Sequence, residues 1–594
     1  MTSLKNGEWT QFKEAKGNMS LIALIDTSEA SAGSLLHCRP QSSMFPAFEH
    51  FGMPYQILDL REKKLCKEDV FSHSCIVIAQ ESLGRRLSSQ EMSLLIDAVN
   101  EGVGLVNFDS DVAQYSNSFR EALGMFGEVS AYSTPLVRVC NDTHYITGTR
   151  ELGETIEFKR PVEIAHVEAL KNAITLLRSA EGVPAVFATR SGKGKAVQFA
   201  ISPKVWLDEY LGHASGLDDI FWKSIVWAAK KPFLMMAMPP FVTCQFDDCY
   251  GSSNPFKKGS DSAVVNLGYI DVLNEFGYVP HVSFFIDQVD EKDERKIKEK
   301  YDKGLAEFSA HAFAETLDFE TAHFIYQRTH GFEYTYEELD EIFAKVDEKF
   351  RRWGIVPSKV VDPHWQNPGL RSLRYLKERG QTYVMFNALF GMAYSDPCAC
   401  LWRNGPYGKH DYSSSYVFDY IQIPQDFPDA KTGDFFIVQA YLGPDFLGGK
   451  TVFNNENKFN DIDAAAEKAA LQIKRGLDSL FFGNVMCHEQ RIAALSLEEW
   501  RAIFTKVEKL TSKYHKIHKS YEYIAQYAKN KCGCRIVEAV HNLAEGKVSC
   551  ILKGGTDMPL QVYVFRDKNE GVEYHFETIP PFKESVTVSY QLAP

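Results

Sequence analysis

The first 238 residues alternate short hydrophobic runs with amphipathic segments. Strand-like runs cover residues 21–25, 75–79 and 102–108. A helical pattern covers residues 88–100, and residues 185–201 are predicted to form a hairpin with a glycine-containing turn. Short buried strands separated by amphipathic helices are typical of a parallel α/β sheet. We therefore expect an α/β domain with a flavodoxin-like parallel sheet over residues 1–238.

The same alternation continues through residues 239–534. Seven strand-like runs cover residues 241–246, 281–286, 308–311, 359–362, 382–386, 420–423 and 484–488. Helical patterns lie between most of them. Seven strands with helical crossovers fit a (β/α)7-type barrel, complete or slightly incomplete, whose chemistry would sit at the carboxyl ends of the strands.

Residues 535–594 show no helical period. Hydrophobic and polar residues alternate there, and glycine-containing turns interrupt the alternation. This pattern predicts a small C-terminal antiparallel β domain, similar to a β-sandwich. The chain is thus expected to form three domains, covering residues 1–238, 239–534 and 535–594.

The overall composition narrows the classes of partner. Of 594 residues, 45% are hydrophobic and 24% are charged, as in average soluble globular proteins. The net charge of −13 argues against a nucleic-acid partner, because phosphate backbones are bound by basic surfaces. A neutral or cationic small partner is compatible with this charge, and assembly into a homo-oligomer stays open.

The sequence also bears on the cellular compartment. No hydrophobic run reaches the ~20 residues that a membrane-spanning helix needs, and residues 1–16 contain no hydrophobic signal-peptide core. The 12 cysteines are spread along the chain. We expect reduced thiols, a cytoplasmic location and no membrane partner.

The sharpest chemical candidate is the pair Asp247 and Asp248, which directly follows the hydrophobic run from Phe241. Successive side chains of an extended strand point in opposite directions, so the two carboxylates face different surroundings. One can bind a cation while its neighbour handles a proton. The structural alternative is a helix N-cap or a turn.

A second candidate is His311, which ends another strand-like run. If the chain turns helical there, Glu315 lies on the same face, four residues later. Imidazole nitrogen with carboxylate oxygen suits zinc or a similar divalent ion. A partly buried histidine beside a surface glutamate is the alternative.

Two further clusters follow strand-like runs. Asp362, His364, Trp365 and Asn367 combine polar groups with an aromatic ring and could line a sugar site, although the prolines among them could simply shape a loop.

The last strand-like run ends in His488 and Glu489. His488 is a candidate general acid that Glu489 would orient, and the alternative is a strand-end histidine held by a hydrogen bond. His281 begins its strand rather than ending it. That end of a barrel contributes stability, so His281 is not included in the site.

These motifs together resemble the polysaccharide deacetylase superfamily, which includes carbohydrate esterase family 4. Phe246-Asp247-Asp248 is similar to the Thr-Phe-Asp-Asp-Gly motif of that family. His311 with Glu315 is similar to its His-x-x-x-His motif, residues 362–364 lie where its third motif would fall, and His488 is similar to its closing histidine. The resemblance covers about half of the chain.

The resemblance implies roles for individual residues. Asp247 would be the general base, Asp248 and His311 metal ligands, and His488 the general acid in removing an acetyl group from a sugar. Glu315 stands in place of the second histidine ligand and Asp362 in place of an arginine. A carboxylate ligand is compatible with zinc, and manganese or calcium become stronger alternatives.

The first region resembles the class I glutamine amidotransferase-like fold, including trehalose-utilisation-type domains. In that family a nucleophilic cysteine follows a central strand. The corresponding run here, residues 104–109, contains no cysteine. The resemblance therefore implies a non-catalytic domain that helps to shape the site or an oligomer interface.

Three functions remain open at this point. The first is a metal-dependent hydrolase that deacetylates a carbohydrate. The second is a glycoside hydrolase on the same barrel, with paired carboxylates drawn from Asp248, Glu315, Asp362 and Glu489. The third is a catalytically silent sugar-binding protein, in which Asp248 and His311 would not converge.

Overall fold

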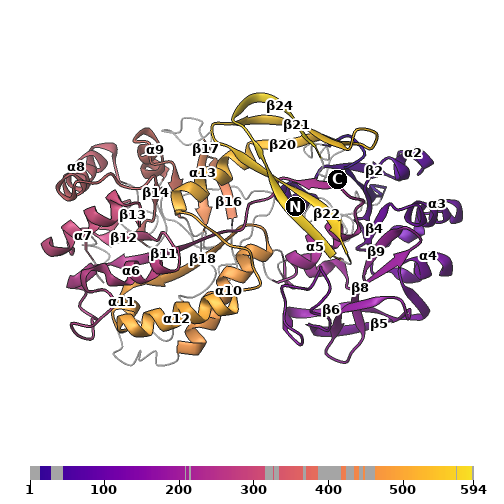
Figure 1. Cartoon of the computed structure of the whole chain (residues 1–594), viewed down its shortest axis with the longest axis horizontal. Coiled ribbons are helices and arrows are strands. Elements are labelled where there is room, and N and C mark those ends of the chain that lie inside the picture. Colours follow the sequence, from indigo (N-terminus) through magenta and orange to yellow (C-terminus); the bar gives the residue numbers. More distant parts are fainter. Residues whose placement is uncertain are drawn as a thin grey trace. The chain divides into compact units, whose positions relative to one another are not determined.

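The structure is a computed structural model in which the chain divides into two compact units (Figure 1). Unit 1 comprises Met1–Met238 and Asn530–Pro594, and unit 2 comprises Pro239–Lys529. The structure describes residues 14–28, 44–207, 209–212, 216–314, 325–326, 334–364, 370–385, 417–422, 434–439, 446–447, 462–569 and 571–591.

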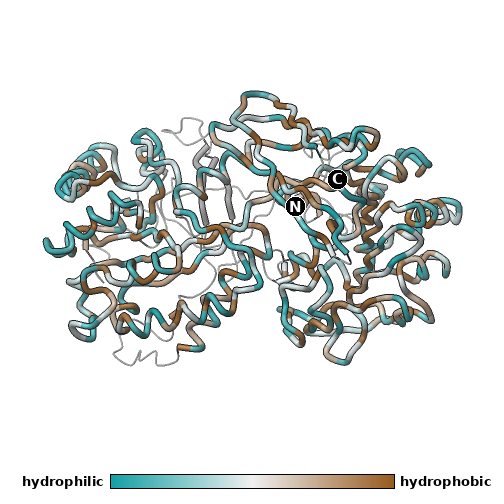
Figure 2. The backbone as a smooth tube through the Cα atoms, in the orientation of Figure 1, coloured by the Kyte–Doolittle hydropathy of each residue, from teal (hydrophilic) through white to brown (hydrophobic). Residues whose placement is uncertain are grey.

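Unit 1 is built on a nine-stranded sheet with the strand order β2-β1-β3-β4-β9-β8-β7-β5-β6. Five neighbouring strands in this sheet are parallel. They are β2 (Tyr55–Asp59), β1 (Leu21–Ile25), β3 (Cys75–Ile78), β4 (Gly104–Asn107) and β9 (Gly194–Phe199). Figure 2 shows hydrophobic residues along these strands. β1, β3 and β4 are completely buried, as expected for a parallel sheet covered on both faces.

The other half of the sheet is antiparallel, and the sequence analysis predicted only part of it. It contains β8 (Pro184–Ser191), β7 (Ile174–Ser179), β5 (Met125–Val139) and β6 (Thr155–Ala169). The hairpin β8–β9 that joins the two halves was predicted. β5 and β6 were missed because their many exposed polar positions give no continuous hydrophobic run.

Helices complete unit 1. They are α1 (Phe45–Phe51), α2 (Lys67–Phe71), α3 (Ser89–Asn100), α4 (Asn117–Ala122) and α5 (Asp218–Ala228). In α3, the Ser88 hydroxyl accepts a hydrogen bond from the Glu91 amide and the Glu91 carboxylate accepts one from the Ser88 amide. This capping box explains why the helix starts where the sequence predicted.

The C-terminal strands do not form a separate third domain, which corrects the expectation for residues 535–594. They belong to unit 1 and make two antiparallel sheets, β10-β22-β23 and β20-β21-β24. Their bounds are β10 (Phe233–Met235), β22 (Leu560–Lys568), β23 (Gly571–Ile579), β20 (Cys534–Asn542), β21 (Lys547–Thr556) and β24 (Phe582–Gln591). Because β10 precedes unit 2 in the chain and β22 follows it, segments on both sides of unit 2 are needed to complete this sheet.

Unit 2 contains a parallel sheet with the order β13-β12-β11-β18, and β19 also pairs with β11. The strands are β11 (Phe241–Cys249), β12 (His281–Phe285), β13 (Glu307–Ala312), β18 (Phe482–His488) and β19 (Ile517–His518). β11 and β18 are in register over seven residue pairs, ending with Asp247 opposite His488. The carboxyl ends of the first and last predicted strands are therefore adjacent.

A second sheet of unit 2 has the order β14-β15-β17-β16, with β16 antiparallel to β17. Its strands are β14 (Val360–Val361), β15 (Tyr383–Val384), β16 (Val417–Gln422) and β17 (Asp434–Gln439). Within the described residues these two sheets do not pair into one closed barrel, so the expected (β/α)7-type closure is corrected to two separate sheets. The mixed α/β class was correct.

Helices alternate with the strands of unit 2. They are α6 (Gly268–Glu275), α7 (Glu291–Asp302), α8 (Tyr336–Trp353), α9 (Leu370–Glu378), α10 (Ile462–Asp478), α11 (Glu489–Ile492), α12 (Leu497–Leu510) and α13 (Tyr521–Cys532). In the parts of the chain that are described, no helix combines the length and the hydrophobicity needed to cross a bilayer.

The two faces of the parallel sheet differ in chemistry. Side chains on one face, such as Val242, Phe246 and Phe284, belong to the hydrophobic core. The side chains that alternate with them are polar and buried, and we call them the polar face: Thr243, Gln245, Asp247, His281, Ser283, Ser309 and His311. Alternation along each strand thus separates an apolar core from a polar interior that leads to the carboxyl edge.

Close packing of α10 against β18 requires a glycine at position 476, and this requirement can be tested. A Cβ atom on Gly476 would lie 2.0 Å from the carbonyl oxygen of Phe482. We expect Gly476→Ala to lower the free energy of unfolding by about 1–3 kcal/mol through this clash, although alanine is the better helix former. Chemical denaturation of the full chain measures it.

The matched control is Gly555→Ala, because a Cβ there meets nothing closer than 3.5 Å. It should change the free energy of unfolding by less than about 1 kcal/mol. Equal effects of the two substitutions would contradict the packing argument.

Candidate metal centre

A backbone irregularity at the end of β11 sets the direction of the two adjacent carboxylates. The pairing of β11 with β12 shifts register between Phe246 and Cys249, and Asp248 has a φ of 52°. This left-handed conformation is costly for a residue other than glycine and is often found at functional sites. As a result Asp247 points into the polar face and Asp248 points toward a group of histidines.

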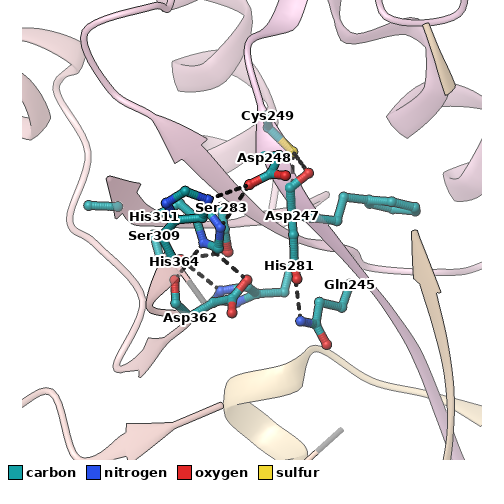
Figure 3. A network of polar contacts seen from close by, with 12 residues as sticks. Gln245, Asp247, Asp248, Cys249, His281, Ser283, Ser309, His311, Asp362 and His364 are labelled. Carbon is teal, nitrogen blue, oxygen red and sulfur yellow. Dashed lines mark hydrogen bonds and ion pairs between the residues drawn. The ribbon is translucent and has the colours of Figure 1, made fainter. Parts of the chain in front are cut away.

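Asp248 and two histidines, which come from the ends of three different strands, lie close together (Figure 3). His311 Nε2 lies 3.0 Å and His364 Nε2 lies 3.6 Å from Asp248 Oδ1. One ligand atom from each of these three residues lies within 4.8 Å of the others, so the group could hold a metal ion. The sequence predicted the meeting of Asp248 and His311.

His488 approaches the same carboxylate from β18. Its Nε2 lies 3.9 Å from Asp248 Oδ2, and its side chain is 31% exposed, against 15% for Asp248 and 3% for His311. Among these groups, His488 is therefore the one most open to a molecule that approaches from solvent.

Burial and charge act in opposite directions at Asp248. Burial alone would raise the pKa of Asp248, but the hydrogen bond from His311 and the charges of His364 and His488 lower this pKa well below its usual range. Burial lowers the pKa of His364 to about 3, against the opposing effect of the Asp248 carboxylate.

Asp362 fixes the orientation of His311. His311 Nδ1 lies 2.7 Å from the carbonyl oxygen of Asp362, so Nδ1 carries the proton because a carbonyl can only accept. Nε2 faces Asp248, and a metal ion held between the two residues would take the lone pair of this nitrogen. Such an outer hydrogen bond is the usual way to orient a metal-binding histidine.

Asp362 was expected to bind substrate, and the structure corrects that expectation. Its side chain is fully buried, and its carboxyl oxygen Oδ2 lies 3.5 Å from His311 Nδ1. Burial and the neighbouring carboxyl of Asp247 raise the pKa of Asp362 well above its usual range. Asp362 thus supports the histidine from inside the protein and presents no surface to a ligand.

Asp247 lies on the same inner side. It is 2% exposed, and the Gln245 side chain donates a hydrogen bond of 2.8 Å to Asp247 Oδ1. Asp247 and Asp248 therefore have different neighbours, as predicted, but the left-handed backbone at Asp248 separates them and not the alternation of an extended strand.

Glu489 has contacts that differ from its expected role. Its carboxylate accepts hydrogen bonds from the backbone amides of Tyr250 and Gly251 at 2.6 and 2.9 Å, and from the Asn254 side chain at 3.0 Å. Burial raises the pKa of Glu489 to about 8, and the hydrogen bonds from Asn254 and Gly251 act in the opposite direction. These are the contacts of an anchor for the turn after Asp248, rather than of a partner that orients His488.

A second buried carboxylate holds the same turn. Asp293 of α7 accepts hydrogen bonds from the Ser252 amide at 2.6 Å and from the Ser252 hydroxyl at 2.7 Å. Gly251 has a φ of 64°, and a Cβ there would lie 2.6 Å from Asp293 Oδ2. Asp293 could not be identified from the sequence, because its position in a charged helix suggests a solvent-exposed side chain.

Aromatic rings pack beside the histidines. The Phe285 ring lies edge-on to His364 and His311, with centroids 5.2 and 5.6 Å apart, and Tyr250 packs on its other side at 5.0 Å. Together with Ala312 these two aromatic residues form a small buried cluster. This cluster restricts the imidazoles, and sequence analysis could not separate it from ordinary core residues.

The predicted site is brought together in part. Asp248, His311 and His488 converge, and His364, which was assigned to substrate binding, joins the metal-binding group, whereas Asp247 lies on the inner side beside Gln245. Glu315, Trp365 and Asn367 lie outside the described residues.

Comparisons with known proteins identify no family. No family model matches the chain, and no curated protein matches it. Similar solved structures include a ThuA-like protein from Bacteroides uniformis, with 14% identity and a TM-score of 0.28, over 36% of this chain and 95% of that one. A cytoplasmic protein from Salmonella typhimurium has 11% identity and a TM-score of 0.26, over 32% of this chain and 88% of that one.

An exo-β-1,4-mannosidase from an Opitutaceae bacterium has 13% identity and a TM-score of 0.24, over 36% of this chain and 37% of that one. These similarities are too low to support conclusions about activity. The resemblance to polysaccharide deacetylases therefore stays a prediction.

The anchoring role of Glu489 can be tested by measuring the free energy of unfolding. Glu489→Ala leaves several buried donors without an acceptor, so we expect the free energy of unfolding to fall by about 2–3 kcal/mol in chemical denaturation. Glu498→Ala, at an exposed position of α12, is the control and should be neutral. A Glu489→Ala protein with unchanged stability would restore the catalytic interpretation.

Proposed function

We propose that this protein is a metal-dependent hydrolase that removes acetyl groups from a carbohydrate. The observation that supports this proposal is the convergence of Asp248, His311 and His364, with Asp247 and His488 beside them. Five potential ligands or proton carriers, two of them adjacent on β11 and the others from three further strand ends, thus lie at the carboxyl edge of the sheet, where α/β proteins place their chemistry.

The donor set fits a divalent metal ion. One carboxylate and two imidazoles are a common set for catalytic zinc, which keeps a further position open. Asp248, His311 and His364 would hold the ion, and manganese is the main alternative. When bound, such an ion acts as a Lewis acid toward a carbonyl oxygen and lowers the pKa of water.

The proton-transfer roles fall to the two flanking residues. Asp247 would accept a proton from the attacking water, and the hydrogen bond from Gln245 holds the carboxylate in place. His488 would donate a proton to the leaving group, a role that suits its partial exposure.

The described carboxylates favour this proposal over the paired-carboxylate glycosidase. Glu489 is occupied by backbone amides, and Asp362 is buried against Asp247. The silent binding protein required Asp248 and His311 to stay apart, whereas their side chains lie 3.0 Å apart. Metal-assisted hydrolysis needs a cluster of metal ligands such as Asp248, His311 and His364.

Metal content tests the site directly. We expect elemental analysis of the purified protein to find about one zinc or manganese per chain, and none in Asp248→Ala, which removes the central ligand. Asp302→Ala, an exposed position on α7, is the control and should keep the metal. Metal absent from the native chain, or retained in Asp248→Ala, would refute the proposed centre.

Activity is measured as acetate released from a panel of N- and O-acetylated oligosaccharides. A chelator should abolish the release, and added zinc or manganese should restore it. Release of reducing sugar without acetate would instead support the glycosidase alternative.

The role of Asp247 is tested separately. Asp247→Asn keeps the shape of the side chain but removes the base, so we expect kcat to fall by about 10²–10⁴-fold while the metal content stays unchanged. Steady-state kinetics and elemental analysis on the same preparation measure both. An Asp247→Asn enzyme with nearly native kcat would exclude Asp247 as the base.

A further inference from the structure

The Asp247 carboxylate is held by a side chain of its own strand (Figure 3). Gln245 lies two residues earlier on β11, so its side chain lies on the same face as that of Asp247. Gln245 Nε2 donates a hydrogen bond of 2.8 Å to Asp247 Oδ1. Gln245 is completely buried and Asp247 is 2% exposed, so solvent has little access to this hydrogen bond.

Asn484 of β18 contacts the other end of the Gln245 amide. Asn484 Nδ2 donates a hydrogen bond of 3.4 Å to Gln245 Oε1, and Asn484 is also buried. In the register of β11 and β18, Asn484 is opposite Thr243, so Gln245 lies two residues further along the neighbouring strand. Long side chains still reach each other at this diagonal spacing. Two hydrogen bonds through one amide therefore connect Asp247 with Asn484.

These two hydrogen bonds determine which way the Gln245 amide faces. An ionised carboxylate only accepts hydrogen bonds, so a base at position 247 needs the NH2 end of the amide. The oxygen end then faces Asn484, whose NH2 group supplies a donor. With Asn484 unchanged, a reversed Gln245 amide would place an acceptor against the carboxylate and two NH2 groups against each other. Asn484 thus favours the orientation in which Gln245 donates to Asp247.

Hydrophobic packing does not account for the two amides. The opposite face of the same two strands contributes to the hydrophobic core, with Cys244, Phe246, Val485 and Cys487. A buried amide costs free energy unless its hydrogen bonds are made, whereas an apolar side chain of similar shape avoids this cost. The amides lie only on the side that carries Asp247. Their placement therefore favours a role that involves this carboxylate.

We propose that Gln245 and Asn484 are positioning residues for the proposed base: Asn484 orients the Gln245 amide, and this amide holds the Asp247 carboxylate. Neither residue needs to touch the metal ion or the substrate for this role. The inference rests on the proposed function, because Asp247 is assigned as the base only there. It gives β18, the strand that ends in His488, a second contribution to the site.

Steady-state kinetics of acetate release from the acetylated oligosaccharides tests the role in the full chain. Gln245→Met removes both hydrogen-bonding groups and keeps a similar side-chain length. We expect kcat to fall by about 10-fold, less than on loss of the base, because the carboxylate stays but is no longer held in place. KM, and the metal content from elemental analysis, should stay within about twofold of the native values.

A double variant tests whether Gln245 acts through the base. In the Asp247→Asn background, adding Gln245→Met should change the remaining kcat by less than about twofold, because no carboxylate is left to position. A 10-fold loss of the same size in both backgrounds would refute the positioning role.

Chemical denaturation tests the link to Asn484 without an activity measurement. Gln245→Met and Asn484→Leu each leave one buried amide without its partner. The double variant should therefore lose less stability than the sum of the two single losses.

Gln472 of α10 provides the matched control, because its buried side chain accepts a hydrogen bond from the Met486 amide of β18. Gln472→Leu also removes a buried amide that contacts this strand. It should lower stability but leave kcat within about twofold of the native value.

The outcomes separate the two proposals. A native chain without metal, or one that binds metal but releases no acetate, refutes the proposed function and this inference with it. Acetate release by the native chain, with Gln245→Met and Asn484→Leu at native kcat, refutes the positioning role alone. Additive losses of stability, or an equal fall of kcat in Gln472→Leu, also refute it. If Gln245→Met fails to fold, Asn484→Leu decides, because it leaves Gln245 in place and should lower kcat by about 3–10-fold.

Discussion

The Asp248 carboxylate depends on a backbone conformation that costs free energy, and much of the surrounding structure serves to hold it. The left-handed φ of 52° turns the side chain out of the strand toward His311. On the following turn, Glu489 and Asp293 accept the backbone amides that would otherwise be buried without partners. Strain of this kind persists only where neighbouring contacts outweigh it.

Electrostatics at the carboxyl edge follows from the same arrangement. Asp248 stays ionised because three imidazoles surround it, whereas Asp362 lies deeper and beside another carboxyl. The pKa values of two aspartate carboxyl groups are therefore shifted in opposite directions within one site. Environments that push pKa values apart are a general sign of division of labour between acidic residues.

The sequence predicted those parts of the structure that local pattern determines. The hydrophobic runs predicted the parallel strands. The polar residues at the ends of these runs identified Asp247, Asp248, His311 and His488 as candidates. Because the carboxyl ends of parallel strands share one edge, position after a strand was sufficient for their convergence.

Features that depend on tertiary pairing could not be predicted in this way. Asp362 and His364 lie two residues apart, yet one is buried and the other faces Asp248, a difference that only the path of the chain after β14 decides. The strand-end position of Glu489 is the same as that of a catalytic residue, but α11 turns its carboxylate toward the backbone of another loop. Closure of a barrel likewise depends on pairing between strands far apart in the sequence.

The topology of unit 1 has a consequence for synthesis of the chain. Unit 2 lies in the chain between β10 and its pairing partner β22, so β22 is made only after the whole of unit 2. At the two ends of unit 2, the rings of Phe241 and Tyr527 lie 5.1 Å apart, so unit 2 can close on itself early. On the ribosome, unit 2 can therefore reach its native form before β22 has been made and unit 1 can be completed.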